Sequence, residues 1–279
     1  MLVTALDGFL DAGNASALAS AYLIGEAAGR VVASFEVDEF YDYRARRPPL
    51  TFVEDHYADY AAPRLVVRLM EDRLGSPYLL LSGPEPDIRW EAFAKAVRAV
   101  VQHFDVRLVV SMGSVPMAVP HTRPVQLTNH ATAHRLLVQE NVWRGEIRVP
   151  ASAQSLVELR LGEWGHDAMG FVAHIPHYVA QFDYPQAAVA LLEGLEDVTG
   201  LQWDLDSLKE AGESRQVEIA TQIADSDDVR DVVTGLEQQY DAYHSQAANL
   251  LADDEPLPSG EEIGAQFEQF LARLEEPED

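Results

Sequence analysis

Histidine and arginine follow a predicted buried strand in one short stretch, residues 113–124. His121 ionises near neutral pH and is a candidate general acid or base, and Arg123 is a candidate anion ligand. A nearby serine, Ser111 or Ser114, suggests a serine hydrolase. The segment Gly-Ser-Val-Pro lacks the Gly-x-Ser-x-Gly elbow, however, and no acidic partner is identifiable. We therefore interpret the stretch as a loop made rigid by prolines, with a catalytic or anion-binding site as the alternative.

A second stretch, residues 167–185, carries His174 and His177 where another predicted strand ends. Polar side chains at strand ends often form the site of an α/β sheet. Two histidines three residues apart across a proline do not share a helix face, so this spacing does not indicate zinc. We predict no metal site here and keep both histidines as candidate ligand or partner contacts.

The richest polar constellation is segment 38–49, which alternates acidic, tyrosine and arginine residues. Arg44 and Arg47, with Arg89 further on, have the guanidinium groups that grip carboxylates or phosphates. Glu39 belongs to the acidic residues that would neutralise these arginines in an empty site. Tyrosine and arginine are also typical interface anchors, so a partner surface explains this composition equally well. A surface loop whose charges pair with one another is the simpler alternative.

Asp11 and Asn14 lie in the predicted turn between the first strand and the first helix. Either side chain can cap that helix, and either can face a ligand at the edge of the sheet. The glycines of this turn and of segment 83–90 match neither the dinucleotide fingerprint nor the phosphate loop. We therefore expect no nucleotide bound through these loops, and we predict no cofactor.

Composition narrows the function classes. The chain has 279 residues and no cysteine, which excludes disulfides, thiolate metal sites and a cysteine nucleophile. Its net charge of −26 disfavours nucleic acid and anionic membranes as partners, and no apolar run reaches the length of a membrane span. The first residues resemble a strand and not a signal peptide. We predict a cytoplasmic protein with neither nucleic-acid nor membrane partners.

Periodicity predicts an α/β domain over residues 1–200 and an acidic helical region over 201–279. Residues 196–279 hold 23 acidic and only 4 basic residues. Predicted strands cover 2–6, 31–35, 65–70, 78–82, 107–112, 125–127 and 169–174. Predicted helices cover 15–28, 90–104, 152–164 and 184–195, followed by 206–224, 229–249 and 263–274. One hairpin interrupts the alternation of strand and helix, which favours a mixed sheet between helical layers.

Taken together, several of these segments resemble the PAC2 family, which is named for a eukaryotic proteasome assembly chaperone. The similarity is greatest to actinobacterial members. The residues that carry it are 8–15, 36–48, 83–90, 120–124, 174–178 and 184–185, with 236–241, 258–261 and 267–271 in the late part of the chain. The resemblance implies a three-layer α/β fold with a mixed sheet, related to purine nucleoside phosphorylase. It also implies a small homo-oligomer, with a trimer favoured.

The resemblance implies no particular enzymatic activity. We expect a non-enzymatic assembly or interaction factor whose partners are other copies of itself and the proteasome or another protein assembly. Chaperone members of the family can end in a hydrophobic-Tyr-any motif, whereas this sequence ends in 275–279, Glu-Glu-Pro-Glu-Asp. We therefore expect no docking through such a tail. The alternative is an enzyme or small-anion-binding protein on a phosphorylase- or hydrolase-like fold that uses Arg44, Arg89, His121 and Arg123.

Overall fold

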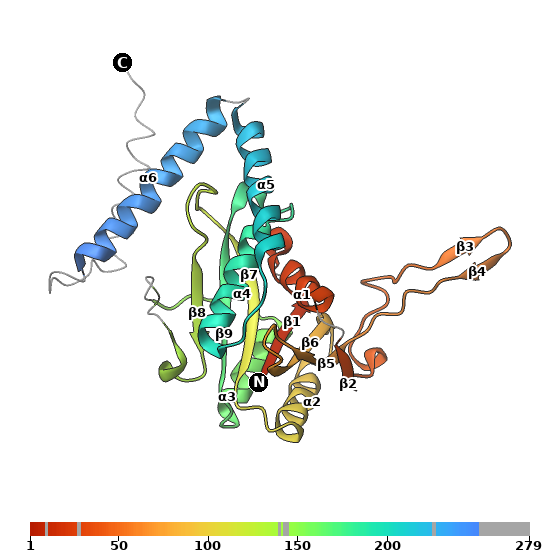
Figure 1. Ribbon diagram of the computed structural model, residues 1–279. Coiled ribbons are helices and arrows are strands. Elements are labelled where there is room, and N and C mark those ends of the chain that lie inside the picture. The colour runs from red at the N-terminus through yellow and green to blue at the C-terminus, as the bar shows by residue number, and fades with distance from the viewer. Residues whose placement is uncertain (9–10, 27–28, 139–140, 142–144, 225–226, 251–279) are drawn as a thin grey trace, which may run out of the picture.

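The computed structural model describes residues 1–8, 11–26, 29–138, 141, 145–224 and 227–250. Within them, seven strands form one mixed sheet in the order β2-β5-β6-β1-β7-β9-β8 (Figure 1). The strands are β1 (Leu2–Asp7), β2 (Arg30–Ser34), β5 (Val66–Glu71), β6 (Pro77–Pro84), β7 (Val109–Met117), β8 (Leu127–Ala131) and β9 (Ala168–Pro176). The strands β6, β1, β7 and β9 run parallel, whereas β5 and β8 run antiparallel to the strands that they pair with.

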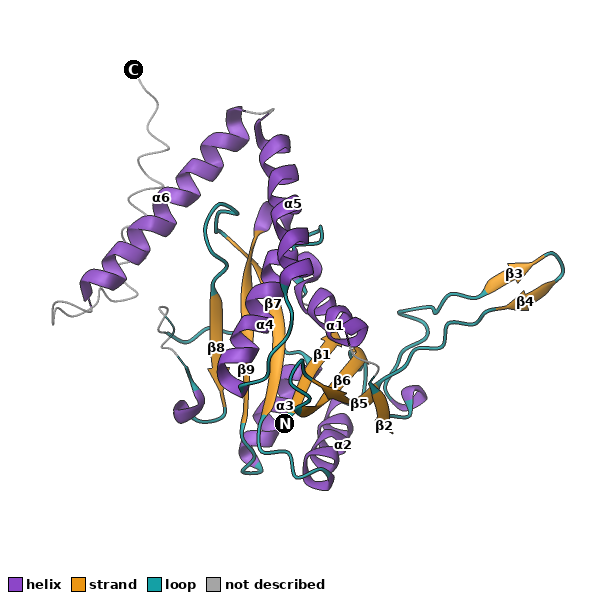
Figure 2. Cartoon of the chain, viewed as in Figure 1, coloured by secondary structure: helices purple, strands orange, loops and turns teal. Residues whose placement is uncertain are grey.

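Helices cover both faces of this sheet (Figure 2). One face packs against α1 (Ala15–Glu26), α4 (Pro185–Thr199) and α5 (Asp206–Ala224). The other face packs against α2 (Trp90–His103) and α3 (Ala153–Glu163). Alternate residues of the central strand therefore enter two different cores: Val3 packs on the first face and Leu2 on the second. The predicted three-layer α/β fold with a mixed sheet is confirmed, and so is the antiparallel hairpin β5–β6.

Two strands extend further than the sequence predicts. β7 continues through residues 113–117 and β9 through Pro176, and the two stay in register as far as the pair Met117–Pro176. The prolines in these runs suggest a loop, but β1 pairs with β7 only from Val109 to Ser111. Beyond Ser111, the described residues add one isolated bridge on that side, between Asp11 and Ser114, and no strand is paired with Pro116 there, where a residue without an N–H group is tolerated.

The strand predicted at 125–127 lies instead at 127–131, because its position is set by pairing with β9 from Leu127–Ala173 to Ala131–Met169. The other side of β8 is a sheet edge. There the side-chain amide of Asn141 makes the two backbone hydrogen bonds that a neighbouring strand would make. Its Oδ1 accepts from the Asn129 amide at 2.8 Å, and its Nδ2 donates to the Asn129 carbonyl at 2.6 Å.

A projecting arm is the main feature that the sequence analysis missed. Among the described strands, β3 (Thr51–Val53) and β4 (His56–Ala58) pair only with each other, and they stand away from the body (Figure 1). The short alternating run between Pro49 and Tyr60 is the signal that points to it.

The C-terminal helices predicted at 206–224 and 229–249 correspond to α5 and to α6 (Asp227–Leu250). Helix α5 buries Leu208 and Ile219 in the core shared with α1 and α4. The helix predicted at 263–274 lies outside the described residues. Among those described, no helix is both long and apolar enough to span a membrane.

Candidate functional site

The connections after β1 and β6 leave the sheet on opposite faces, β1 towards α1 and β6 towards α2. The crevice between two such strands is the usual ligand site of an open α/β sheet. Here the strands end side by side, with Asp7 paired to Pro84. Burial raises the pKa of the Asp7 carboxyl, and the charge of Asp11 raises it further, while Arg46 opposes the shift. Asp7 is nevertheless exposed, so the end of β1 places a carboxyl group of raised pKa at the surface between the two strand ends.

Asp11 is the cap of α1, as predicted for one of the two residues of this turn. Its Oδ1 accepts from the Ser16 amide at 2.8 Å and the Ser16 hydroxyl at 2.6 Å, and its Oδ2 accepts from the Ala17 amide at 3.0 Å. The Ser114 hydroxyl also donates to Oδ1, at 3.0 Å. Asn14 instead adopts a left-handed backbone with φ of 49° and donates from Nδ2 to Asp183 at 2.6 Å.

Glu85 takes the equivalent position at α3. Its buried carboxylate accepts from the backbone amide of Ala153, the first residue of α3, at 2.6 Å. The free amides at a helix N-terminus are a ready anion site. In this crevice both adjacent N-termini are occupied by the chain's own carboxylates, Asp11 at α1 and Glu85 at α3. A phosphate would meet negative charge here instead of free donors.

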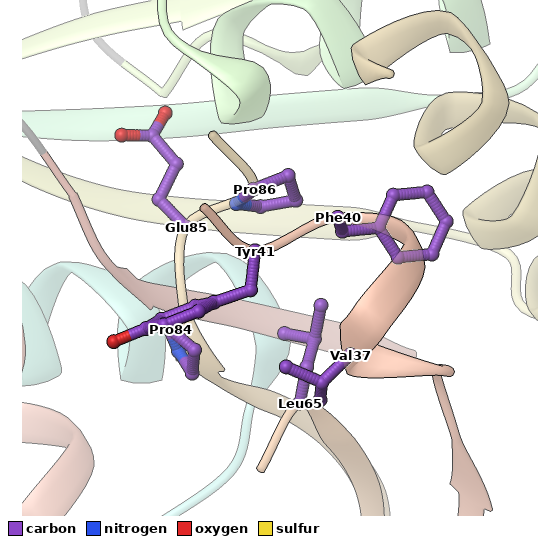
Figure 3. Close-up of a pocket in the computed structure, with 7 residues that line it drawn as sticks. All are labelled: Val37, Phe40, Tyr41, Leu65, Pro84, Glu85 and Pro86. Atoms are coloured by element: carbon purple, nitrogen blue, oxygen red, sulfur yellow. The ribbon is translucent and has the colours of Figure 1, made fainter. Parts of the chain in front are cut away.

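Arg46 fastens the segment after β2 to the loop after β6. Its guanidinium donates to the Glu85 carbonyl at 2.5 Å, pairs with Asp87 at 2.8 Å and lies over the Tyr41 ring at 4.7 Å. The Asp42 amide donates to the other Asp87 oxygen at 2.7 Å. Beneath this contact is a cavity of only about 10 Å³, too small for more than a single water. Figure 3 shows its lining: Val37, Phe40, Tyr41, Leu65, Pro84, Glu85 and Pro86.

The other charged candidates of this region are spread over the surface. Glu39, at the end of the short helix η2 (Val37–Glu39), forms an ion pair with Arg89. Arg89 has a left-handed backbone with φ of 58° at the start of α2. Arg44 and Arg47 are exposed, and no side-chain partner for either is found among the described residues. Segment 38–47 is therefore a surface in which some charges pair with each other, and not a converging anion site.

His121 is buried, with only 4% of its surface exposed, and lies against Tyr178. The Tyr178 hydroxyl accepts from the His121 amide and lies 2.8 Å from His121 Nδ1. The hydroxyl can donate to Nδ1 of a neutral imidazole whose proton is on Nε2, or it can accept from an Nδ1–H group, and the tautomer of His121 decides between the two. Burial lowers the pKa of His121, and the charge of Glu237 opposes this.

Arg123 contacts the C-terminal helix α6. Its Nε and Nη2 donate to the two oxygens of Asp241 at 2.8 and 2.6 Å, and Nη1 lies 3.3 Å from Glu237. These carboxylates raise the pKa of Arg123 further above its usual value. Through these contacts α6 covers the loop that carries His121 and Arg123.

The two histidines of the second stretch do not meet. His174 Nε2 lies 2.8 Å from the Thr128 hydroxyl, and burial lowers the pKa of this histidine. His177 is exposed at the start of η4 (His177–Val179) and packs its ring edge-on against Tyr178. In the described part of the chain, no group of three or more His, Cys, Asp or Glu side chains is arranged to hold a metal ion.

The structure thus does not bring together the residues that the anion-binding alternative requires. Asp11 and Asn14 lie at the crevice, and His121 and Arg123 lie together under α6. Arg89 starts α2, which Figure 1 shows well apart from α6. Three residues that the sequence analysis did not single out complete these clusters: Asp7, Glu85 and Tyr178. Asp7 was detectable as the first polar residue after a buried strand, but the others come close only through tertiary packing.

Comparison with known proteins shows the family to which the chain belongs. The model of the PAC2 family matches residues 5–223, so the chain belongs to the PAC2 family. A Mycobacterium tuberculosis protein of unknown function is 45% identical, with a TM-score of 0.83 over 88% of this chain and 85% of that one. A comparison with curated proteins finds no match.

Two further solved structures carry family descriptions. A proteasome-assembly chaperone homologue of Mycobacterium tuberculosis is 28% identical, with a TM-score of 0.76 over 83% of this chain and 99% of that one. A PAC2 family protein of Streptomyces avermitilis is 29% identical, with a TM-score of 0.73 over 83% and 98%. The descriptions of these structures name no phosphorylase, so that part of the fold expectation stays a prediction.

Proposed function

We propose that this protein is a non-enzymatic, cytoplasmic assembly factor that works as a homo-oligomer, with a trimer favoured, and that the arm β3–β4 is its main contact surface. The observation that carries the proposal is the arm itself, because its apolar side chains face solvent. The family supports the role: one relative is described as a proteasome-assembly chaperone homologue. The proteasome, or another protein assembly, is accordingly the client that we propose.

Several large apolar side chains of the arm are exposed to solvent. Phe52 is 59% exposed and Tyr57 is 71% exposed. Their rings pack edge to face, with 5.2 Å between the ring centroids. Leu50, Val53 and Tyr60 are also exposed. An isolated two-stranded hairpin is only marginally stable in water, and contiguous exposed apolar groups mark interaction sites. A partner surface that covers these side chains would stabilise the arm.

A groove of about 620 Å³ lies at the base of the arm, beside the edge strand β2. Val31 of β2, apolar residues that follow β2 and the chain entering β5 line it, and Glu36, Asp38 and Arg64 add charge. The volume is in the range of ligand-binding clefts. Arm and groove together give each copy both a projecting and a receiving surface, which suits contact between copies of the chain.

Native mass measurement tests the oligomer and the arm together. We expect the wild-type chain to be an oligomer and the double variant Phe52→Ser/Tyr57→Ser to have a lower mass with unchanged far-UV circular dichroism. Leu159→Ser, which changes an equally exposed apolar residue on α3, should keep the wild-type mass. A monomeric wild-type chain, or an arm variant with the wild-type mass, contradicts the assignment of the arm.

The client is tested with purified proteasome α-type subunits. We expect the wild-type chain to raise the yield or rate of ring assembly, and the arm variant to do so less. The alternative function, binding of a small anion, is tested by calorimetry with inorganic phosphate. Binding that Arg123→Ala abolishes would favour that alternative. In the structure both Arg89 and Arg123 already pair with carboxylates, so we expect no such binding.

A further inference from the structure

Helix α6 meets the loop 121–124 through carboxylates on one of its faces. Glu237 and Asp241 lie one helical turn apart, and both contact the loop. Asp241 takes two parallel hydrogen bonds from Arg123, and Glu237 accepts from the Thr122 hydroxyl. Between them in the chain, Tyr240 donates its hydroxyl to the Pro124 carbonyl at 3.2 Å. The residues of α6 that contact the loop are thus an acid, a tyrosine and a second acid, in that order.

Hydrogen bonds that do not involve α6 also hold the loop 121–124 in place. The Tyr178 hydroxyl accepts from the His121 amide, and the Gln216 side chain of α5 donates to the His121 carbonyl at 3.3 Å. Arg123 therefore projects from a supported backbone. A guanidinium matches the two oxygens of a carboxylate with two parallel hydrogen bonds, as Arg123 does with Asp241. The loop is a cationic, carboxylate-binding feature on a chain of net charge −26.

The polar contacts that hold α6 are partly open to water. The side chain of Asp241 is 55% exposed and that of Arg123 is 30% exposed. Ion pairs at such exposure stabilise weakly and are screened by salt. The contact persists in the free protein because α6 is tethered to α5, which keeps its effective concentration at the loop high. An untethered helix with the same pattern and additional contacts can compete for the loop.

We infer that the loop 121–124 is a receptor for an acidic helical segment of a partner protein, and that α6 is its occupant in the free protein. The fitting segment carries two carboxylates four residues apart with a tyrosine directly before the second. This surface is separate from the arm, so the inference does not rest on the proposed role of the arm. Loss of oligomers in the arm variant leaves the loop intact, and the two tests can fail independently.

The first test measures whether carboxylates hold α6 in place. Because the chain has no cysteine, Gln181→Cys and Gln238→Cys give a clean pair of spin-label sites on exposed residues of the body and of α6. We expect one short distance in the otherwise wild-type chain and a broad, longer distribution in Glu237→Lys/Asp241→Lys. Asp231→Lys changes an exposed acid on the same helix and should keep the short distance. An unchanged distance in the double variant overturns the inference.

The second test measures whether the vacated loop accepts a helix from outside. The probe is a synthetic peptide of residues 227–250, titrated onto the full-length Glu237→Lys/Asp241→Lys chain. We expect an affinity at least about tenfold higher than for the wild-type chain, where the tethered helix competes. Arg123→Ala in the same background should remove binding, and so should the two lysine substitutions in the peptide. Equal or absent binding to both chains, or binding that Arg123→Ala leaves unchanged, overturns the receptor.

Discussion

The Ser114 hydroxyl, in the second half of β7, donates to the same Asp11 oxygen that caps α1, 3.0 Å away. One carboxylate therefore joins the first helix to a strand about a hundred residues later in the chain. The Ser114 hydroxyl also lies 2.7 Å from the Ala12 carbonyl, so it bridges both sides of the turn. The contact therefore holds the turn between β1 and α1 against β7.

Replacing Asp11 by alanine should lower the free energy of unfolding by about 1–3 kcal/mol, since it removes a helix cap and leaves the Ser114 hydroxyl with one acceptor fewer. Asp11→Asn, which keeps one carbonyl oxygen, should cost less. Denaturant unfolding monitored by circular dichroism measures both. The exposed Asp231→Ala is the control. If Asp11→Ala is no more damaging than that control, the capping role is wrong.

Gly170→Ala should destabilise the fold by about 1–3 kcal/mol, because a Cβ there would stand 2.1 Å from the Ser111 hydroxyl and 2.4 Å from the His130 ring. Both neighbours are in register with Gly170, on β7 and β8. Adding Ser111→Ala should recover part of the loss. Thermal unfolding of Gly25→Ala, a helical glycine whose added Cβ meets nothing within 4 Å, should show equal or higher stability. A neutral Gly170→Ala would contradict the packing.

Asp72 ties the turn after β5 to the segment after α4. Its buried carboxylate accepts from the amides of Leu74 and Ser76, and from that of Gln202 at 3.0 Å. Burial alone would raise the pKa of this carboxyl, but the hydrogen bonds outweigh it and lower the pKa below 3.8. Asp72→Ala should cost about 2–4 kcal/mol of unfolding free energy at neutral pH.

The pH dependence of that effect follows from the lowered pKa. The carboxylate stabilises the fold fully above its unfolded pKa, and this contribution is lost as the pH falls below it. The difference between wild type and Asp72→Ala should therefore shrink at about pH 3. A difference that stays constant down to that pH would show that the carboxylate charge is not what stabilises the turn.

Buried His121 should make the protein less stable in mild acid. Its folded pKa lies below the usual 6.5, so the unfolded chain binds the proton more readily and stability falls as the pH drops below about 6.5. Burial of His174 acts in the same direction. His121→Gln should therefore show a smaller loss of unfolding free energy between about pH 7.5 and about pH 5 than wild type. Equal losses in the two proteins would exclude His121 as a source of the pH dependence.

Much of the fold is predictable from local sequence pattern. Strands such as β1 and helices such as α2 carry long apolar periodicities, and these predict their positions within a few residues. The ends of β7 and β9 and the position of β8 are not predictable in this way. Backbone pairing between strands far apart in the chain sets them, and it overrides the local preference of Pro116 or Asn129.

The sequence by itself determined the family, the layered α/β class and the acidic helices at 206–224 and 229–249, but it left the cap of α1 open between Asp11 and Asn14. These features depend on residue types and on their spacing over short stretches of the chain. Only the tertiary structure decided which charges meet. It placed Glu85 at α3 and Asp241 at Arg123, and it left Arg89 apart from His121. An ion pair forms between whichever side chains the fold brings within a few ångströms, and sequence distance does not encode that separation.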